Sequence, residues 1–354
     1  MGIIRILLTI SVIVSHSTPI PGLCLPDGET AVQAFFIISG FYMSLVLNEK
    51  YTEKKALRHY LKNRFLKIYP VYWCVLLLTL SFSLAIFLKS HGSNTAGFTY
   101  YAEYGDSMSP ATFLFLIFTN IFIFFQDIVM FLGLNTSTGE LFFTANFRET
   151  LPMLYDFLFI PQAWTIGVEL MFYLIDPFLV RRKLKIIVLF IAVSLLLRLA
   201  LYHYGLYEDP WSYRVFPNEL ALFLCGTVAY HIYRRLPSID TGRNYLMLIY
   251  GCILLLIVTF EMIPVVFLLK KTVFLAVFAI ALPFIFQLWK RSAKDRYIGE
   301  LSYPVYISHL LIKTCLVAIG IQTSGLYLAA ATIFFSIILN ETLTKRITKY
   351  KSKG

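Results

Sequence analysis

The feature that most constrains the fold of this chain is a series of eleven apolar runs of spanning length. A helix rises about 1.5 Å per residue, so a run of about 17 to 24 residues can cross the roughly 30 Å hydrocarbon core of a bilayer. We therefore expect an all-α polytopic membrane protein. The runs lie at residues 2–17, 31–48, 68–88, 111–134, 164–180, 185–202, 215–233, 245–261, 267–289, 299–319 and 324–343.

Composition and charge agree with this class. Only 14% of the 354 residues are charged and 58% are hydrophobic, whereas soluble domains average about 25% charged. The net charge of +11 does not indicate nucleic-acid binding, because Lys and Arg crowd the short connections between apolar runs. The five cysteines have no metal-binding spacing. We expect neither a metal nor a nucleic-acid partner.

The basic connections predict the topology. They lie at 49–67, which includes Lys54 and Lys55, at 181–185, 234–243 and 290–296, and in the tail from Lys345. Basic connections are usually cytoplasmic, so an even number of spans must separate each pair. Three runs separate Lys67 from Arg181, so either one run does not cross or the connection 135–161 hides another crossing. We expect about ten spans, cytoplasmic termini and a re-entrant or interfacial segment at 111–134; eleven or twelve spans are the alternatives.

The N-terminal run is expected to be a membrane helix rather than a signal peptide. A small-x-small cleavage site does not follow it, since the chain continues Thr18-Pro19-Ile20-Pro21. We therefore predict one transmembrane domain over residues 1–343 and a short basic cytoplasmic tail over residues 344–354.

Two polar residues of this first run are candidates for a functional role. Arg5 and His16 are eleven residues apart, which places them on one helix face about 16 Å apart along the axis. Ionisable groups inside a bilayer are costly and usually functional. The alternative is that Arg5 is a topology anchor and His16 a polar residue at a helix end.

Further polar residues lie in or beside later runs. Arg64 and Lys67 share a helix face at a basic boundary, where they can hold a phosphate or simply anchor the helix. Glu169 in an apolar run requires a partner, either an Arg or Lys of the first or third span or a Trp and Tyr edge. Arg198 and Arg214 flank a hairpin and can form packing contacts or bind substrate. The other candidates are Ser39, beside Gly40 in a small-residue contact, and Ser302, Tyr303 and His309, with Lys313 one turn beyond.

Five motifs together resemble the acyltransferase-3 family of multi-span membrane O-acyltransferases. Each is weak alone, but they occur in order over nearly the whole chain. They are Arg5-x10-His16, FFIISGF at 35–41, RFLKIYP at 64–70, WTIGVELMFY at 164–173 and IGELSYPVYISH at 298–309.

The resemblance implies roles for individual residues. His16 matches the proposed catalytic base and Arg5 its basic partner, while Glu169 matches the acidic position of the tryptophan–glutamate motif. Arg64 matches the first member of the family's arginine pair, whereas Lys67 replaces the second and puts bidentate donor binding in doubt. Gln33 stands where many members carry Asp. We expect no hydrolase domain of the SGNH type after the last helix.

The implied activity is transfer of an acyl group, usually from cytoplasmic acetyl-CoA, to a hydroxyl of a lipid-linked or surface glycan such as an O-antigen lipopolysaccharide or an exopolysaccharide. The implied location is a bacterial inner membrane. Direct transfer and an acyl-histidine intermediate both remain open, as do a glycan transporter or flippase and a membrane scaffold. We assign His16, Arg5 and Glu169 to catalysis, Arg64, Lys67, Tyr69, Ser39 and Trp164 to the donor, and Arg198, Arg214, Ser302, Tyr303 and His309 to the acceptor.

Overall fold

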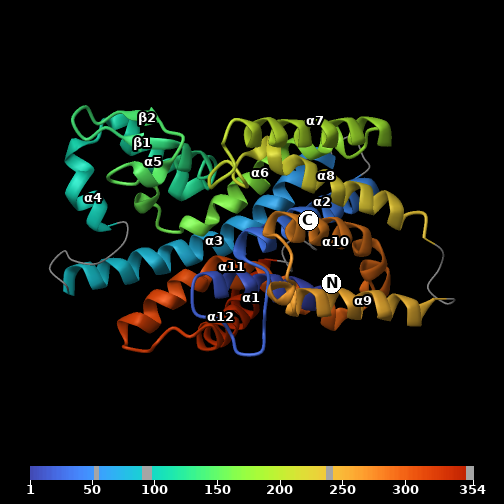
Figure 1. Cartoon of the computed structure of the whole chain (residues 1–354). Coiled ribbons are helices and arrows are strands. Elements are labelled where there is room, and N and C mark those ends of the chain that lie inside the picture. Colours follow the sequence, from blue (N-terminus) through green and yellow to red (C-terminus); the bar gives the residue numbers. More distant parts are fainter. Residues whose placement is uncertain (52–55, 90–97, 237–241, 348–354) are drawn as a thin grey trace. The chain divides into compact units, whose positions relative to one another are not determined.

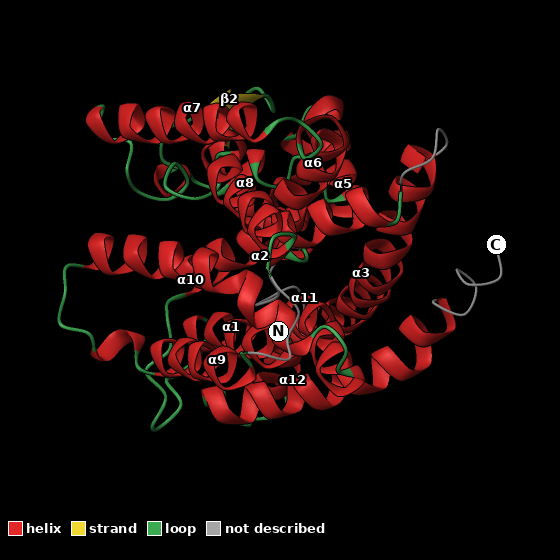
Figure 2. Cartoon of the chain, turned by 90° about the vertical axis from the view of Figure 1, so that its right-hand side faces the viewer, coloured by secondary structure: helices red, strands yellow, loops and turns green. Residues whose placement is uncertain are grey.

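The computed structural model of the protein, shown in Figures 1 and 2, describes residues 1–51, 56–89, 98–236 and 242–347. Lys54, Lys55 and residues 348–354 of the expected tail lie outside the described residues. The described residues are mainly helical. The helices are α1 (Gly2–Ser15), α2 (Gly28–Glu49), α3 (Ala56–Lys89), α4 (Phe98–Tyr104), α5 (Pro110–Phe122), α6 (Trp164–Leu179), α7 (Leu184–His203), α8 (Phe216–Tyr233), α9 (Arg243–Val258), α10 (Phe267–Trp289), α11 (Ala293–Ala318) and α12 (Gly325–Leu339).

The expected helical membrane architecture is confirmed. Six of the described helical segments are long and apolar enough to cross a bilayer. They are α2, α3, α7, α10, α11 and the segment Gly325–Ile347, in which α12 continues through a π-helical turn at Asn340–Thr344. The apolar helices α1, α5 and α9 are shorter. At 14 residues α1 is about 21 Å long, which is less than the roughly 30 Å hydrocarbon core. The expected number of about ten spans stays a prediction.

Contacts divide the chain into two compact units. The first contains Met1–Lys67, Ile175–Val193 and Glu219–Gly354, and the second contains Ile68–Leu174 and Ser194–Asn218. Each unit is described below by itself.

In the first unit, two glycines let α2 and α8 approach closely. A Cβ atom on Gly40 would lie 1.8 Å from the carbonyl oxygen of Phe223, and one on Gly226 would lie 2.0 Å from that of Ile37. Side chains of any size are therefore excluded at both positions. The small-residue helix contact expected beside Ser39 is confirmed for Gly40.

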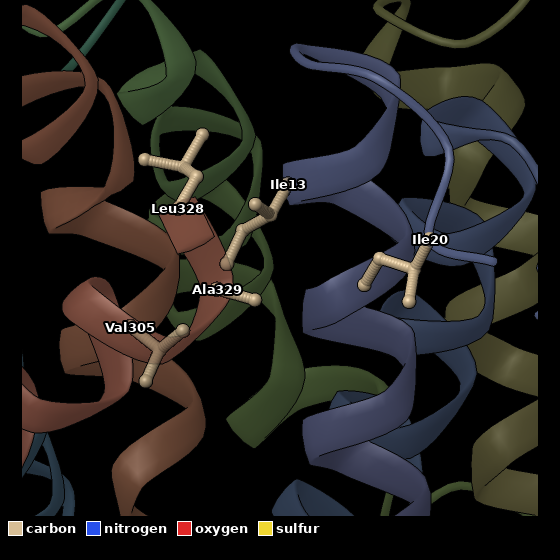
Figure 3. Packing of buried hydrophobic residues seen from close by; sticks show 5 residues of the cluster. All are labelled: Ile13, Ile20, Val305, Leu328 and Ala329. Carbon is tan, nitrogen blue, oxygen red and sulfur yellow. The ribbon is translucent and has the colours of Figure 1, made fainter. Parts of the chain in front are cut away.

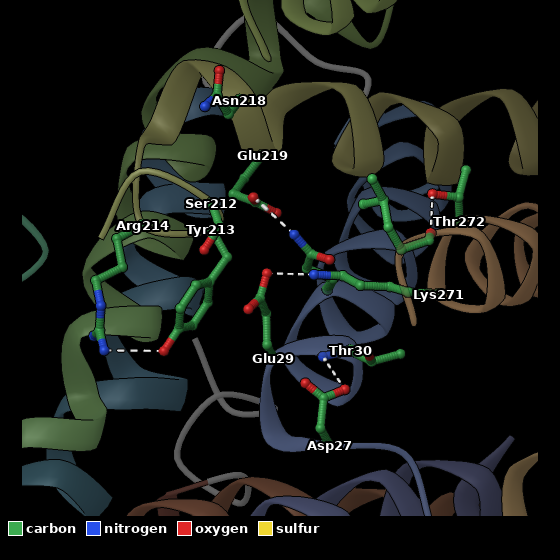
Figure 4. Close-up of polar contacts among 12 residues, drawn as sticks. Asp27, Glu29, Thr30, Ser212, Tyr213, Arg214, Asn218, Glu219, Lys271 and Thr272 are labelled. Carbon is green, nitrogen blue, oxygen red and sulfur yellow. Dashed lines mark hydrogen bonds and ion pairs between the residues drawn. The ribbon is translucent and has the colours of Figure 1, made fainter. Parts of the chain in front are cut away.

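Buried polar pairs join the beginnings of α2, α8 and α10. Lys271 of α10 forms an ion pair with Glu29 of α2 (Figure 4). Gln33 Nε2 donates to Glu219 Oε1 of α8 over 3.0 Å, and both side chains are fully buried. Buried charges need such partners, because taking an unpaired ion out of water costs several kcal/mol.

Two basic connections of the first unit lie at the other ends of these helices. Arg181 donates to the carbonyl oxygen of Leu47 near the end of α2 over 2.7 Å. Lys290, directly after α10, donates to the Tyr233 hydroxyl at the end of α8 over 3.1 Å. Cationic side chains therefore gather where α2, α8 and α10 end, as expected for a cytoplasmic boundary.

In the second unit, the apolar run 111–134 is not one helix. Helix α5 ends at Phe122, and Ile123 adopts a left-handed conformation with φ of 67°. Side chains of α3 satisfy the last carbonyl groups of α5, which lack partners within a helix. Tyr69 donates to Phe122 over 2.6 Å, Trp73 donates to Ile121 over 2.9 Å, and Tyr72 donates to Asn120. The 13-residue α5, about 20 Å long, is too short to cross a bilayer.

A short hairpin and several 3-10 turns follow α5. Strand β1 (Leu132–Leu134) pairs antiparallel with β2 (Leu141–Phe143), with Gly133 opposite Phe142. The side chain of Asn120 holds the following segment, because its Oδ1 accepts from the Phe159 amide over 2.9 Å and its Nδ2 donates to the Phe157 carbonyl over 3.0 Å. The sequence predicts residues 135–161 as a connection, with a hidden crossing as the alternative. The part around Phe157 and Phe159 is held by these side-chain bonds.

Candidate active site

Helix α1 ends one residue before His16, which serves as its C-cap and is exposed. The hydroxyl groups of Ser15 and Ser17 donate to the carbonyl groups of Val12 and Ile13. Pro19 then prevents the helix from continuing. The run 2–17 was expected to be helical up to and including His16, with a helix-end position as the alternative. The structure places His16 directly after the last residue of the helix, with its ring exposed.

The beginning of α1 is bound tightly to the beginning of α11. The Gly2 amide donates to Asp295 Oδ1 over 2.8 Å, so a carboxylate of α11 caps α1. A Cβ atom on Gly2 would lie 2.0 Å from the Asp295 carbonyl oxygen. Arg5 lies at the same end, with Nη1 3.2 Å from the position that a Cβ atom would take on Gly299. Arg5 and His16 thus mark opposite ends of one helix.

At the other end of α1, the ring of His16 packs against the ring of His309. The two centroids are 5.2 Å apart and the ring planes are inclined by 35°. His309 of α11 is fully buried, and its Nδ1 lies 2.5 Å from the Tyr306 carbonyl oxygen. Lys313 Nζ donates to the His16 carbonyl oxygen over 2.7 Å. Helices α1 and α11 lie side by side in both views (Figures 1 and 2). The two histidine rings meet where α1 ends, beside the C-terminal half of α11.

An apolar cluster supports this end of α1. Ile13 and Ile20 pack with Val305 of α11 and with Leu328 and Ala329 of α12 (Figure 3). All five side chains are buried. The cluster fixes the chain on both sides of His16, so the exposed imidazole is attached to a rigid base.

Arg64 and Lys67 lie in the first unit on α3. Arg64 is half-buried, with its guanidinium 5.7 Å from the centre of the Tyr60 ring and Nη1 3.7 Å from Met43 Sδ. Lys67 is exposed. A fixed guanidinium beside an exposed ammonium on one helix face is a suitable site for a phosphate.

The other candidates of the first unit are held within helices. Ser39 is half-buried in α2 beside Gly40. Ser302 is buried, and its hydroxyl donates to the Gly299 carbonyl oxygen of the same helix over 2.7 Å. Tyr303 follows it on α11 and is half-buried.

The second unit contains Trp164 and Glu169 of α6. Trp164 is buried under the guanidinium of Arg214, which lies 4.3 Å from the ring centre. Glu169 is half-buried and accepts a 2.5 Å hydrogen bond from the hydroxyl of Tyr173, one turn later. A tyrosine partner was one of the expected alternatives for Glu169.

Arg198 and Arg214 organise the segment before α8. Arg214 forms an ion pair with Asp209. It also donates to the Tyr213 hydroxyl over 3.0 Å (Figure 4). Arg198 Nη2 donates to the Asn218 carbonyl oxygen over 3.0 Å. Both arginines therefore have packing partners within their own unit, which is the structural alternative that the sequence left open.

The structure thus brings together two pairs of candidates that are distant in sequence. One pair is His16 with His309, and the other is Trp164 with Arg214. Tyr69, assigned to the donor, uses its hydroxyl to hold the end of α5. Sequence reasoning missed Asp295. A signal for it was present, because Ser292 marks the start of α11: its hydroxyl caps this helix by accepting from the Asp295 amide. Sequence reasoning also missed Asp127, a buried carboxyl in the turn after α5. Burial raises the pKa of Asp127 to about 6.

Comparison with known proteins identifies the family of the chain. A family model described as an acyltransferase domain of the acyltransferase-3 type matches residues 1–341. No curated protein and no solved structure matches the chain. The match includes both helices of the histidine pair and the basic part of α3. The chain therefore belongs to the acyltransferase-3 family and is a membrane acyltransferase.

Proposed function

We propose that this protein is an acetyl-CoA-dependent O-acetyltransferase of a bacterial inner membrane. The acceptor is a hydroxyl of a lipid-linked or surface glycan, such as an O-antigen or an exopolysaccharide. The observation that carries the proposal is the exposed imidazole of His16, held against a buried histidine in a chain of an acyltransferase family. A near-neutral histidine suits general base catalysis because both of its protonation states are accessible.

The orientation of α1 supports donor and acceptor sites at opposite ends. The Gly2–Asp295 contact places the start of α1 beside the basic connection 290–296, which is expected to be cytoplasmic. Arg5 is at that end and His16 at the other. Both termini are cytoplasmic in this proposal, and residues 1–343 act as one transmembrane domain.

The proposed reaction is direct transfer. Arg64 and Lys67, assisted by Arg5, bind the phosphates of the donor. His16 removes the proton of the acceptor hydroxyl while its oxygen attacks the thioester carbon. The carbon–sulfur bond then breaks, and the thiolate of coenzyme A takes up the proton.

The remaining candidates complete the proposed sites. Glu169 supports catalysis through its bond with Tyr173. Three side chains contribute to the donor site and four to the acceptor site. The donor group is Ser39, Tyr69 and Trp164, and the acceptor group is Arg198, Arg214, Ser302 and Tyr303.

Labelled acetyl-CoA tests the proposal and separates it from glycan transport. Membranes or purified protein supplied with the acceptor glycan are expected to release coenzyme A and to label the glycan. His16→Ala is expected to abolish both while the protein level is unchanged. His231→Ala, at a histidine of α8 that packs on Tyr230, serves as the matched control. Acetyl transfer by His16→Ala would disprove the catalytic assignment, and glycan translocation without acetyl transfer would favour the transporter.

A further inference from the structure

The hydrogen bond of His309 determines which of its nitrogens carries the proton. Nδ1 lies 2.5 Å from the Tyr306 carbonyl oxygen. A carbonyl oxygen can only accept, so Nδ1 must donate and carry a hydrogen. In a neutral imidazole the other nitrogen, Nε2, then has a free lone pair.

This Nε2 atom is buried and has no hydrogen-bond partner within the described residues. The side chain as a whole is fully buried. Leaving a buried acceptor unsatisfied costs about 1–3 kcal/mol, so such an atom calls for a donor. The nearest aromatic ring in the neighbouring helix is the imidazole of His16, at a centroid distance of 5.2 Å.

We propose that His309 is the positioning residue of His16: in the substrate complex the exposed His16 ring turns so that its ring N–H donates to Nε2 of His309, which directs the other, unprotonated nitrogen of His16 toward the acceptor hydroxyl. This inference rests on the proposed function and assigns His309 to the base rather than to acceptor binding. The Tyr306 carbonyl, His309 and His16 then form a chain of three groups with one defined proton arrangement.

The proton balance of transfer follows from this chain. The acceptor hydroxyl gives its proton to the unprotonated nitrogen of His16 as its oxygen bonds to the thioester carbon. His16 becomes an imidazolium whose other N–H is held by neutral His309, which stabilises the charge. When the carbon–sulfur bond breaks, the proton taken from the acceptor hydroxyl passes from His16 to the thiolate. His16 returns to its neutral form, and His309 is neutral throughout.

The charged groups near the two histidines do not stabilise the imidazolium of His16 in place of His309. On α11, Lys313 binds the His16 carbonyl oxygen, and its positive charge opposes an imidazolium. Arg5 is about 16 Å away along α1. The neighbouring side chains of α12 in the apolar cluster are Leu328 and Ala329. Within this surrounding, His309 is the group whose acceptor nitrogen favours protonation of His16.

Two amide substitutions at His309 separate positioning from simple structural support. His309→Gln can place an oxygen acceptor near the position of Nε2, whereas His309→Asn can place only a donor near Nδ1, toward the Tyr306 carbonyl. We expect kcat to fall about 100-fold in His309→Asn, with little change in the KM for acetyl-CoA, and within tenfold in His309→Gln. The kcat of His309→Asn is also expected to depend differently on pH. His231→Asn and His231→Gln are the matched controls.

A purely structural role predicts the reverse order, because Asn preserves the bond to Tyr306. Equal activity of Asn and Gln, or Asn exceeding Gln, would overturn the inference. A second measurement does not depend on acyl transfer: carbethoxylation of His16 by diethyl pyrocarbonate, followed by peptide mass spectrometry over a range of pH. We expect the midpoint of modification to move to lower pH in His309→Asn and to stay near the wild-type value in His309→Gln.

The two measurements distinguish the failure of each proposal. If wild-type protein transfers no acetyl group but the His16 midpoint shifts as expected, the proposed function fails and the His309–His16 contact stands. If wild-type protein transfers acetyl and the midpoint is the same in all three proteins, the proposed function stands and the positioning role of His309 is wrong.

Discussion

The Gly2 amide donates a 2.8 Å hydrogen bond to the carboxylate of Asp295, so that a side chain of α11 caps α1. These residues are 293 positions apart. The bond fixes the start of the helix that carries Arg5 and ends at His16. Because His16 lies at the other end of α1, where it packs on His309 of α11, a defect in the cap is expected to disturb the position of His16.

Asp295→Ala is expected to lower the free energy of unfolding by about 1–2 kcal/mol, since a charged cap is lost. Acyl transfer is expected to decrease as well, because α1 loses its fixed start. Thermal unfolding in detergent, together with transfer of label, measures both effects. Glu341→Ala is the control, because its ion pair with Lys345 is exposed and contributes little. An Asp295→Ala protein as stable as the control would contradict the capping role.

Gly40→Ala is expected to destabilise the first unit by about 3 kcal/mol or more, because its methyl group would overlap the Phe223 carbonyl. Gly251→Ala in α9 meets nothing within 4 Å and is expected to be neutral or slightly stabilising through helix propensity. The yield of monodisperse protein and its thermal midpoint check the contrast. Similar midpoints for the two variants would show that α2 and α8 can separate without cost.

Arg64→Ala is expected to weaken donor binding about tenfold, which corresponds to about 1.4 kcal/mol for a lost charged contact to phosphate. The KM for acetyl-CoA should rise more than kcat falls. Arg64→Lys should recover part of the affinity, since it keeps the charge but not the fork. Arg182→Ala removes an exposed arginine that donates to the Phe178 carbonyl oxygen of its own segment, and the variant is expected to bind acetyl-CoA normally. An unchanged KM for acetyl-CoA in Arg64→Ala would show that the donor site does not include Arg64.

Asp127 is expected to make stability depend on pH. Its pKa is about 6 in the folded protein, because burial disfavours the charged form, against about 3.9 in an unfolded chain. Between these values the folded state binds more protons than the unfolded state, so stability falls as pH rises from about 4 to about 6. The full effect is about 3 kcal/mol. Asp127→Asn should flatten this part of the curve of thermal midpoint against pH, and an identical slope in wild type and variant would exclude Asp127 as its source.

The sequence predicted the helical elements well because their signal is local. Apolar length and the basic connections located ten of the eleven runs as helices, with boundaries mostly within a few residues. The run 111–134 is different. Its hydropathy is continuous, but α5 ends at Phe122 because side chains of α3 bind its last carbonyl groups. Hydropathy along the chain contains no information about such partners.

The sequence by itself determined the membrane class and the family, and it singled out Arg5 and His16 as candidates, since these follow from composition, spacing and motif order. Only the tertiary structure decided which side chains meet. His309 lies 293 residues after His16, and the two rings come together because α1 packs against α11, with Gly2 and Gly299 allowing a close approach where the two helices begin. Helix boundaries depend on neighbours in the chain, whereas the proton chemistry of a site depends on helix packing, which brings distant residues into contact.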